Sequence, residues 1–402
     1  MKRPSRYRRP LLGALGAAAL FGPAVFSGCA VNFTPPGKVD SLRVLAVTVD
    51  KPYVAPIDAD ACAADSTKCT VPVTFEMDVV DGLGISTEGA PRPINILWLG
   101  GCFNPEGDQY SLCVIPLLEL FGQAQAKLTE AAETGTIPDF GDLPIGYDIY
   151  AGGPTKPSFT VQVPDIVSSR PEPEYGPHYG IGYVFFLACA GKFGLLDADP
   201  SAAGNFPIGC FDVETNEQLG AESFVPGYTQ IYSFADGREN GVPEITGVTL
   251  FRPSDEKDDE NAAEDKGEPL PEGEENVLVL PPCDVPPQDR NQPASCTRED
   301  AFVACDAYEI QVEVPKDVGE EDPGAEGEDG ETLRETVWVN YYTDTGDFEN
   351  DIKLINDPQT GYIEEHRVRW IPPATPGRAT IWIVVRDSRG GSSSTVRYID
   401  VE

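Results

Sequence analysis

The ten cysteines of this 402-residue chain are the side chains with the clearest chemistry. Cys29 follows Ser27 and Gly28 at the end of a short apolar segment. Small residues at such a place leave the backbone open to a peptidase, and the thiol that follows can carry a diacylglycerol. The sequence therefore predicts lipid attachment at Cys29. The alternative is an ordinary signal peptide that contains a cysteine by chance.

The segment before Cys29 has the order of an export signal. Five basic residues lie within the first nine positions, and residues 11–25 are apolar apart from glycine and proline. That stretch is shorter than the roughly 20 residues of a membrane-spanning helix. The whole segment resembles a bacterial lipobox, in which the cysteine becomes the acylated first residue of the mature chain. We therefore expect residues 1–28 to be a lipoprotein signal peptide and residues 29–38 to be a tether.

The resemblance to lipoproteins also implies a location. Ala30 follows the cysteine where an aspartate would favour retention in the inner membrane. We expect a lipid-anchored protein of the outer membrane, facing either the periplasm or the cell exterior. The membrane is then a partner through the N-terminal lipid, because each buried methylene contributes about 0.8 kcal/mol.

The charge of the mature chain limits its other partners. The full chain has 29 basic and 66 acidic residues, and residues 1–28 carry five of the basic ones. The mature net charge is therefore 24 − 66 = −42. Such a surface repels phosphates, so we expect no nucleic-acid partner.

The nine cysteines that follow Cys29 predict disulfides, as is usual in an exported protein. Their spacing favours three local bonds, although crossed pairings of Cys102 with Cys189 or Cys210 stay open. These bonds are Cys62–Cys69, Cys102–Cys113 and Cys189–Cys210. In the second half Cys296 and Cys305 are the candidate pair, and Cys283 is the candidate for the unpaired cysteine. Zinc is not expected, because no CxxC pair with histidine partners occurs.

Catalytic chemistry has little support in the sequence. His178 and His366 are the only histidines, and each lies beside a turn containing proline or glutamate. No nucleophile elbow, phosphate-binding loop or zinc-protease helix motif occurs. We therefore expect no catalytic site, no cofactor and no enzymatic activity.

Calcium is the one ion with some support. Asp344, Asp347, Glu349 and Asp351 place several oxygen donors on one turn between strands. A hard cation needs six to eight such oxygens. The alternative is a solvated acidic turn, and the spacing does not fit an EF-hand loop. No firm metal site is predicted.

Alternating apolar residues predict an all-β fold with two β-sandwich domains. Residues 71–79 alternate with period two, and glycine and proline are abundant enough for many turns. We expect a first sandwich over residues 39–240. It contains one amphipathic helix at about 116–133, which we expect to cover an open end of the sandwich.

Residues 241–402 form the second predicted domain. Its acidic stretches 253–276 and 317–331 are expected to be disordered loops. Residues 367–402 contain a Pro-Gly corner, an alternating strand and an Asp-Ser-Arg-Gly-Gly turn, and they resemble the last strands of bacterial immunoglobulin-like domains. Trp382 and Val384 fall opposite the expected core, so we expect them to pack on the neighbouring domain.

The chain also resembles the cysteine-containing, immunoglobulin-like outer-membrane lipoproteins of predatory soil bacteria (myxobacteria). The runs 39–56, 97–102 and 386–391 carry this resemblance, which implies no particular activity. The leading hypothesis is a binding, adhesive or structural protein that engages another envelope protein or a polysaccharide. The alternative is an extracellular glycan hydrolase that uses paired carboxylates in the first domain.

Overall fold

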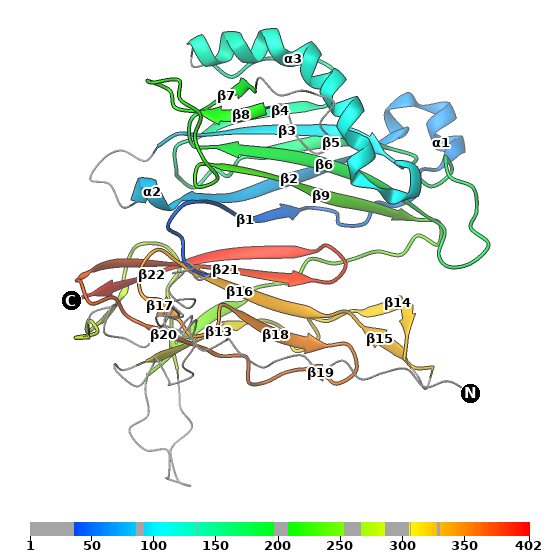
Figure 1. Cartoon of the computed structure of the whole chain (residues 1–402). Helices are drawn as coiled ribbons and strands as arrows, with labels where there is room; N and C mark the ends of the chain where they lie inside the picture. Colours follow the sequence, from blue (N-terminus) through cyan, green and yellow to red (C-terminus); the bar gives the residue numbers. More distant parts are fainter. Residues whose placement is uncertain are drawn as a thin grey trace, which may run out of the picture.

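The computed structural model describes residues 36–85, 92–134, 136–196, 208–252, 267–285, 305, 307–327 and 330–402. Across these ranges the fold is all-β, as predicted, and the layers are stacked on one another (Figure 1). Helix α3 (Val114–Thr134) lies at one end of the stack, and the sheets of the C-terminal half lie at the other.

The first domain is built on two antiparallel sheets whose facing sides enclose an apolar core. The three-stranded sheet has the order β1 (Leu42–Val49), β2 (Thr70–Asp81), β5 (Ser158–Pro164). The four-stranded sheet has the order β4 (Ile145–Tyr150), β3 (Ile94–Phe103), β6 (Tyr179–Cys189), β9 (Phe224–Phe234). Phe75, Trp98 and Val163 are fully buried between the two sheets.

Helix α3 covers the outer face of the four-stranded sheet. It buries Leu117, Phe121, Ala124 and Leu128, which recur at steps of three and four residues. The sequence predicted this helix, but the expected position at an open end of the sandwich is wrong. Strand β3 explains the difference, because its residues from Ile94 to Gly100 are buried on both faces and need a second layer.

Short elements complete the first domain. The hairpin of β7 (Lys192–Leu195) and β8 (Ile208–Phe211) lies beside α3, and Ile208 belongs to the core under that helix. The remaining helical elements are short: α1 (Ala59–Ala64), α2 (Gly82–Ile85), and the 3-10 turns Ser66–Lys68, Glu106–Asp108 and Tyr110–Cys113.

The second domain is a sandwich of a five-stranded and a six-stranded sheet. The first has the order β11 (Glu268–Pro269), β10 (Gly247–Phe251), β13 (Tyr308–Glu313), β20 (Val368–Ile371), β17 (Asp347–Phe348). The second has the order β12 (Leu278–Leu280), β22 (Ser392–Val401), β21 (Gly377–Asp387), β16 (Val337–Thr343), β18 (Ile352–Asp357), β19 (Gly361–Tyr362). Tyr341 and Trp370 are fully buried between them.

The strand order of this domain is that of an immunoglobulin fold. The order β10-β13-β20 corresponds to strands A, B and E, and β22-β21-β16-β18 corresponds to strands G, F, C and C′. Strand β12 joins the last strand, β22, in parallel. The immunoglobulin-like character predicted from residues 367–402 is therefore confirmed.

Parts of the two acidic stretches are ordered, so the expectation of disorder is wrong for 267–276 and 317–327. Leu270 is buried and its N–H donates to the carbonyl of Val248 at 2.8 Å. Strand β14 (Glu321–Glu326) pairs with β15 (Thr332–Arg334). A strand ladder satisfies the backbone whatever the side-chain charge, and acidic side chains at its surface stay hydrated. Residues 253–266 lie outside the described part.

The last residues of the expected tether are bound to the second domain. The N–H of Thr343 donates to Gly37 at 2.8 Å, the N–H of Val39 donates to Thr343 at 2.9 Å, and Lys38 Nζ donates to the Gly346 carbonyl at 2.8 Å. The prediction of a tether is therefore wrong for 36–38. The prediction failed because the backbone of this segment pairs with β16, and a proline-rich sequence gives no sign of such pairing. Cys29 and residues 30–35 lie outside the described residues.

Four disulfides are present in the described chain. Cys62–Cys69, Cys102–Cys113 and Cys189–Cys210 are the three predicted local bonds, so the crossed alternatives are wrong. The fourth bond joins Cys283 to Cys305. The assignment of Cys283 as unpaired, with Cys305 bonded to Cys296, is therefore wrong. Cys283 and Cys305 meet in a small apolar cluster with Ile371, a proximity that spacing does not reveal. Cys296 lies outside the described residues.

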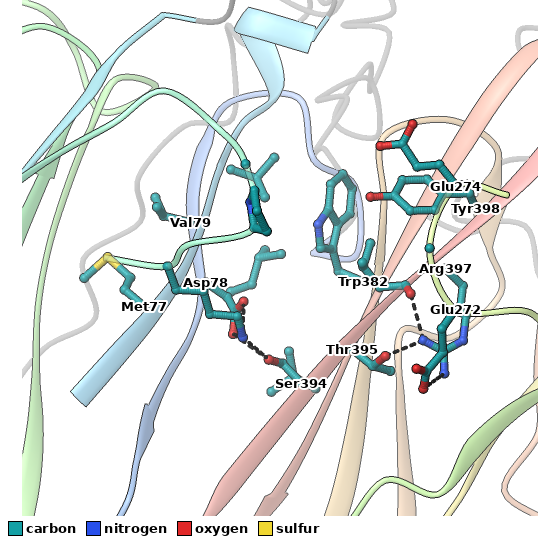
Figure 2. A pocket seen from close by; sticks show the side chains of 18 of the residues that line it. Met77, Asp78, Val79, Glu272, Glu274, Trp382, Ser394, Thr395, Arg397 and Tyr398 are labelled. Atoms are coloured by element: carbon teal, nitrogen blue, oxygen red, sulfur yellow. Dashed lines mark hydrogen bonds and ion pairs between the residues drawn. The ribbon is translucent and has the colours of Figure 1, made fainter. Parts of the chain in front are cut away.

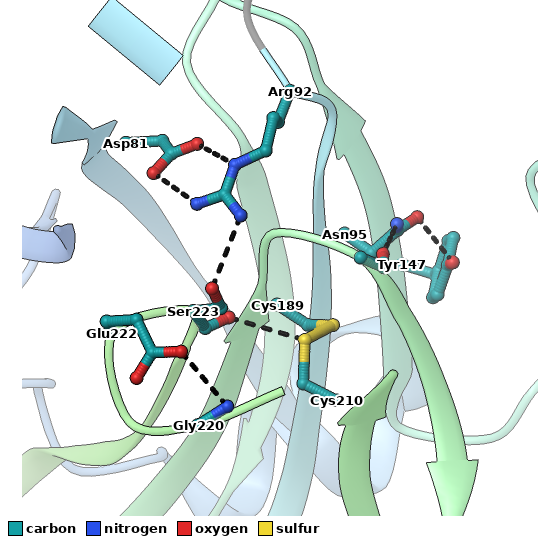
Figure 3. The surroundings of a disulfide bond; sticks show 10 residues. Asp81, Arg92, Asn95, Tyr147, Cys189, Cys210, Gly220, Glu222 and Ser223 are labelled. Carbon is teal, nitrogen blue, oxygen red and sulfur yellow. Dashed lines mark hydrogen bonds and ion pairs between the residues drawn. A yellow bond between two sulfur atoms is a disulfide. The ribbon is translucent and has the colours of Figure 1, made fainter. Parts of the chain in front are cut away.

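The buried disulfide of the first domain generates a prediction about stability. Cys189 and Cys210 are 0% and 1% exposed, next to the pair of Arg92 and Asp81 (Figure 3). Replacing both with serine should lower the free energy of unfolding by roughly 3 kcal/mol, because the unfolded chain loses a closed loop. Urea denaturation measures the loss. Replacing Cys62 and Cys69 with serine is the control. That more exposed bond closes a shorter loop, so its removal should lower the free energy of unfolding by less. Equal losses for the two double variants would contradict the prediction.

Candidate functional site at the domain junction

An apolar seam joins the two domains. Leu45 and Ala46 of β1 pack against Val384 of β21, and Trp382 and Tyr342 lie partly buried beside them. Val384 is only 1% exposed. The prediction that Trp382 and Val384 face the neighbouring domain is therefore confirmed.

Polar contacts extend this seam along β1. The guanidinium of Arg386 donates to the carbonyl of Leu45 and, at 2.6 Å, to Asn340 Oδ1. Ser392 Oγ donates to the carbonyl of Val47 at 3.4 Å. Strand β1 is the edge of its sheet, so side chains of the second domain satisfy carbonyl groups that have no neighbouring strand on that side.

Arg389 is a buried basic group of the junction, 7% exposed. Its guanidinium lies 5.2 Å from the ring centre of Tyr53 in the first domain. It also donates to the carbonyl of Glu239 and, at 3.2 Å, to the carbonyl of Glu321. Tyr53 itself packs on Phe234, with ring centres 4.9 Å apart. One side chain therefore binds the end of the first domain to the hairpin of β14 and β15.

The Asp-Ser-Arg-Gly-Gly turn holds Arg389 in this position. Asp387 Oδ1 accepts from the N–H of Arg389 at 2.7 Å and from that of Gly391 at 2.8 Å. Asn240 Nδ2 donates to Asp387 Oδ2 at 3.2 Å. A side chain at position 391 would lie 2.1 Å from Asp387 Oδ2, so this position requires glycine. The motif noticed in the sequence thus builds the contact between domains.

Two carboxyl groups beside Arg389 are buried. Burial raises the pKa of Glu335 to about 7, and it also raises the pKa of Asp387. Glu335 Oε1 accepts from the N–H of Glu320 at 3.0 Å, while Oε2 lies 3.9 Å from Arg389 Nη1 and accepts no hydrogen bond in the described chain. The carboxyl group of Glu335 is therefore mostly protonated, and so neutral, at mildly acidic pH.

Removing the guanidinium should weaken the junction. We expect Arg389→Ala to lower the free energy of unfolding by about 3 kcal/mol, because buried carboxylates lose their partner. Calorimetry should also show the two domains unfolding at separate temperatures. Arg252→Ala is the control, since its ion pair with Glu268 is exposed, and it should cost less than about 1 kcal/mol. Equal losses for the two variants would contradict the role of Arg389.

The pKa of Glu335 predicts how stability depends on pH. The folded chain holds this proton more tightly than the unfolded chain, whose pKa is about 4.3. The stabilisation is present below that pH and is lost as the pH rises to about 7. In the wild type, the free energy of unfolding should fall by about 3 kcal/mol between these two pH values, and Glu335→Gln should abolish this fall. Urea titrations at several pH values measure it, and the exposed Glu364→Gln should leave the wild-type slope.

A cleft of about 640 Å³ opens beside the seam (Figure 2). One wall comes from β2 and the connection between β4 and β5, and the other from β21, β22 and the segment between β11 and β12. Three aromatic side chains, Tyr150, Trp382 and Tyr398, belong to its lining. The cleft therefore combines planar apolar surfaces from both domains.

Charged side chains of the cleft occur as pairs. Lys156 Nζ lies 2.8 Å from Asp78 Oδ1 and donates to Ser394 Oγ at 2.9 Å, while Ser394 Oγ donates to Asp78 Oδ2 at 2.6 Å. This cluster ties the first domain to β22. Arg378 Nη1 lies 3.2 Å from Glu274 Oε2.

Arg397 forms the third pair and fixes the segment between β11 and β12. It is 2% exposed, donates to the carbonyls of Leu270 at 3.1 Å and Val396 at 2.8 Å, and pairs with Glu272 at 3.3 Å. Burial lowers the pKa of its guanidinium. Sequence reasoning did not select Arg397, although a charge at the inward position of the alternating strand 394–401 was a usable signal.

The residues proposed for calcium do not meet in one site. Asp344 Oδ1 accepts from the N–H of Thr380 at 2.8 Å, and Glu349 pairs with Arg369 at 3.7 Å. Asp347 lies in β17, and the carbonyl of Asp351 accepts from Tyr341. Within the described ranges, no three acidic, histidine or cysteine side chains are grouped as metal ligands. The calcium candidates thus gain no support from this arrangement.

Both histidines bond to backbone carbonyls. His366 is fully buried and its two ring nitrogens lie 2.8 Å from the Ile363 carbonyl and 2.9 Å from that of Val312. His178 Nε2 lies 3.2 Å from the carbonyl of Arg170. These contacts are those of structural side chains.

No protein-family model and no curated protein matches this sequence. Among solved structures, the D00-D0 domain of intimin aligns with 10% identity and a TM-score of 0.17, over 90% of this chain and 98% of that one. Dimeric latent PorU from Porphyromonas gingivalis aligns with 9% identity and a TM-score of 0.17, over 91% of this chain and 24% of that one. At such scores the fold assignment rests on strand order. No helix in the described residues is long and apolar enough to cross a membrane.

Proposed function

We propose that this protein is anchored in the outer membrane by a lipid on Cys29 and binds another surface molecule, an envelope protein or a polysaccharide. The observation that carries the binding role is the cleft between two domains that the seam and Arg389 hold together. Clefts of a few hundred Å³ at domain interfaces, with apolar walls and a few fixed polar groups, are typical ligand sites.

The anchor is supported by the export signal, and the path of the first described residues limits how far the fold can lie from it. Residues 37–39 run along β16 of the second domain. The seven residues 29–35 span at most about 25 Å when extended. Because Val39 packs in the seam between the domains, a lipid on Cys29 would hold the domain junction within about that distance of the membrane surface.

The hydrolase alternative gains no support from the carboxylates of the first domain. Both oxygens of Asp81 accept from the Arg92 guanidinium, at 2.6 and 2.7 Å (Figure 3). Asp148, whose pKa burial raises, accepts from Trp98 Nε1 at 3.2 Å. The carboxyl groups of Asp81 and Asp148 are thus both engaged with side chains of their own domain, so the non-catalytic role stays our proposal.

The anchoring step is tested with Cys29→Ser. We expect this variant to leave the membrane fraction under high-salt washing, because the acyl chains are missing, whereas Ser27→Ala keeps the thiol and stays. Immunoblots of the fractions measure the change. The released chain, labelled with a fluorophore, should then bind isolated envelopes saturably.

Two outcomes contradict the proposal separately. A Cys29→Ser chain that remains in the membrane fraction contradicts lipid anchoring. A released chain that shows no saturable binding to envelopes contradicts the binding role.

A further inference from the structure

We propose that the cleft between the two domains binds a neutral oligosaccharide. This inference rests on the proposed binding function and names the ligand class of the same cleft. It follows from the way the charges, aromatic rings and hydroxyl groups of the lining are arranged.

Every carboxylate of the lining already has a basic partner. Asp78 pairs with Lys156 and Glu272 with Arg397, while Glu274 shares the guanidinium of Arg378 with Asp400. A charged ligand therefore finds no carboxylate in the lining without a basic neighbour. The exposed carboxylates of Glu272 and Glu274 still present directional acceptor atoms, because a carboxylate has about four acceptor sites. Neutral hydroxyl groups can use these sites without breaking an ion pair.

The aromatic rings of the lining suit the apolar C–H face of a sugar ring. Trp382 stands between the two walls in Figure 2, with Tyr398 on the side of the second domain. Both project from one face of the six-stranded sheet, since Trp382 is opposite Val396 and Thr380 is opposite Tyr398. Planar rings offer broad contact at low conformational cost, and the C–H face of a hexose is apolar.

The cleft is fixed before any ligand arrives. The guanidinium of Arg397, 3% exposed, bonds the segment between β11 and β12 to β22. Ser394 and Lys156 bond β22 to Asp78 on the opposite wall. A ligand therefore orders few side chains on binding, which favours affinity for a compact neutral molecule.

An acidic polysaccharide is disfavoured by the net charge, and a basic peptide by the pairing of the carboxylates. An extended peptide that adds to a sheet binds through main-chain groups at a strand edge. Trp382 and Tyr398 instead present a sheet face. The oligosaccharide is the class that uses both the rings and the paired charges.

Calorimetric titration of the full mature chain carrying Cys29→Ser tests the inference. The probes are three neutral pentasaccharides (cellopentaose, laminaripentaose and maltopentaose), the acidic pentagalacturonate, and a pentapeptide of alternating valine and lysine. We expect at least one neutral probe to bind with a stoichiometry of one. Trp382→Leu should weaken it by at least about tenfold, because the ring is lost from the centre of the site.

Trp338→Leu is the matched control, since Trp338 is also half-buried on the outer face of this sheet and does not line the cleft. It should change affinity by less than about twofold. If Trp382→Leu unfolds the chain, Glu274→Gln replaces it, because that side chain is 69% exposed, and it should weaken the same probe.

Three results overturn the inference: no neutral probe binds, the acidic probe or the peptide binds in preference, or binding is unchanged in the cleft variants. If one of these results is found and the released chain still binds envelopes saturably, the oligosaccharide inference is wrong and the proposed binding function stands. If the released chain also fails to bind envelopes, both the inference and the proposed binding function are wrong.

Discussion

The burial of one guanidinium at the junction is the constraint on which the arrangement of the domains depends. A charge that is removed from water must be compensated, and Arg389 is compensated by groups from both domains: the Tyr53 ring, the Glu239 carbonyl and the Glu321 carbonyl. If the domains separate, those partners are lost together. The neighbouring seam of Leu45 and Val384 adds non-directional attraction, whereas Arg389 determines the relative position.

The cleft follows from the same constraint. Because the domains meet at β1 and at the 387–391 turn, their surfaces diverge farther along β22, and the space between them is lined by Asp78 on one side and Trp382 on the other. Ion pairs then fix the walls. The binding role that we propose thus depends on the relative position of the two domains, which Arg389 fixes outside the cleft.

The sequence predicted the periodic elements well. The alternation in 71–79, the helix near 116–133 and the outward position of Trp382 follow from local patterns, and three disulfides follow from spacing. It could not predict the pairing of Lys38 with Thr343, which depends on residues distant in the chain. The Cys283–Cys305 bond was missed because Cys296 lies nearer to Cys305 in sequence, and the ordered β14 was missed because its acidic composition hides the hairpin that it forms with β15. The cleft was missed because its ion pairs join separate segments.

The contact of Lys38 with the second domain also constrains the order of assembly. Its ammonium bonds to the carbonyl of Gly346, 308 residues later in the chain. Contacts so distant in sequence form slowly and only after the intervening chain is available. The first domain can fold as soon as its own residues are available, but the second domain can bind the segment around Lys38 only after Gly346 has been made. The residues that precede the first domain are therefore among the last to be secured.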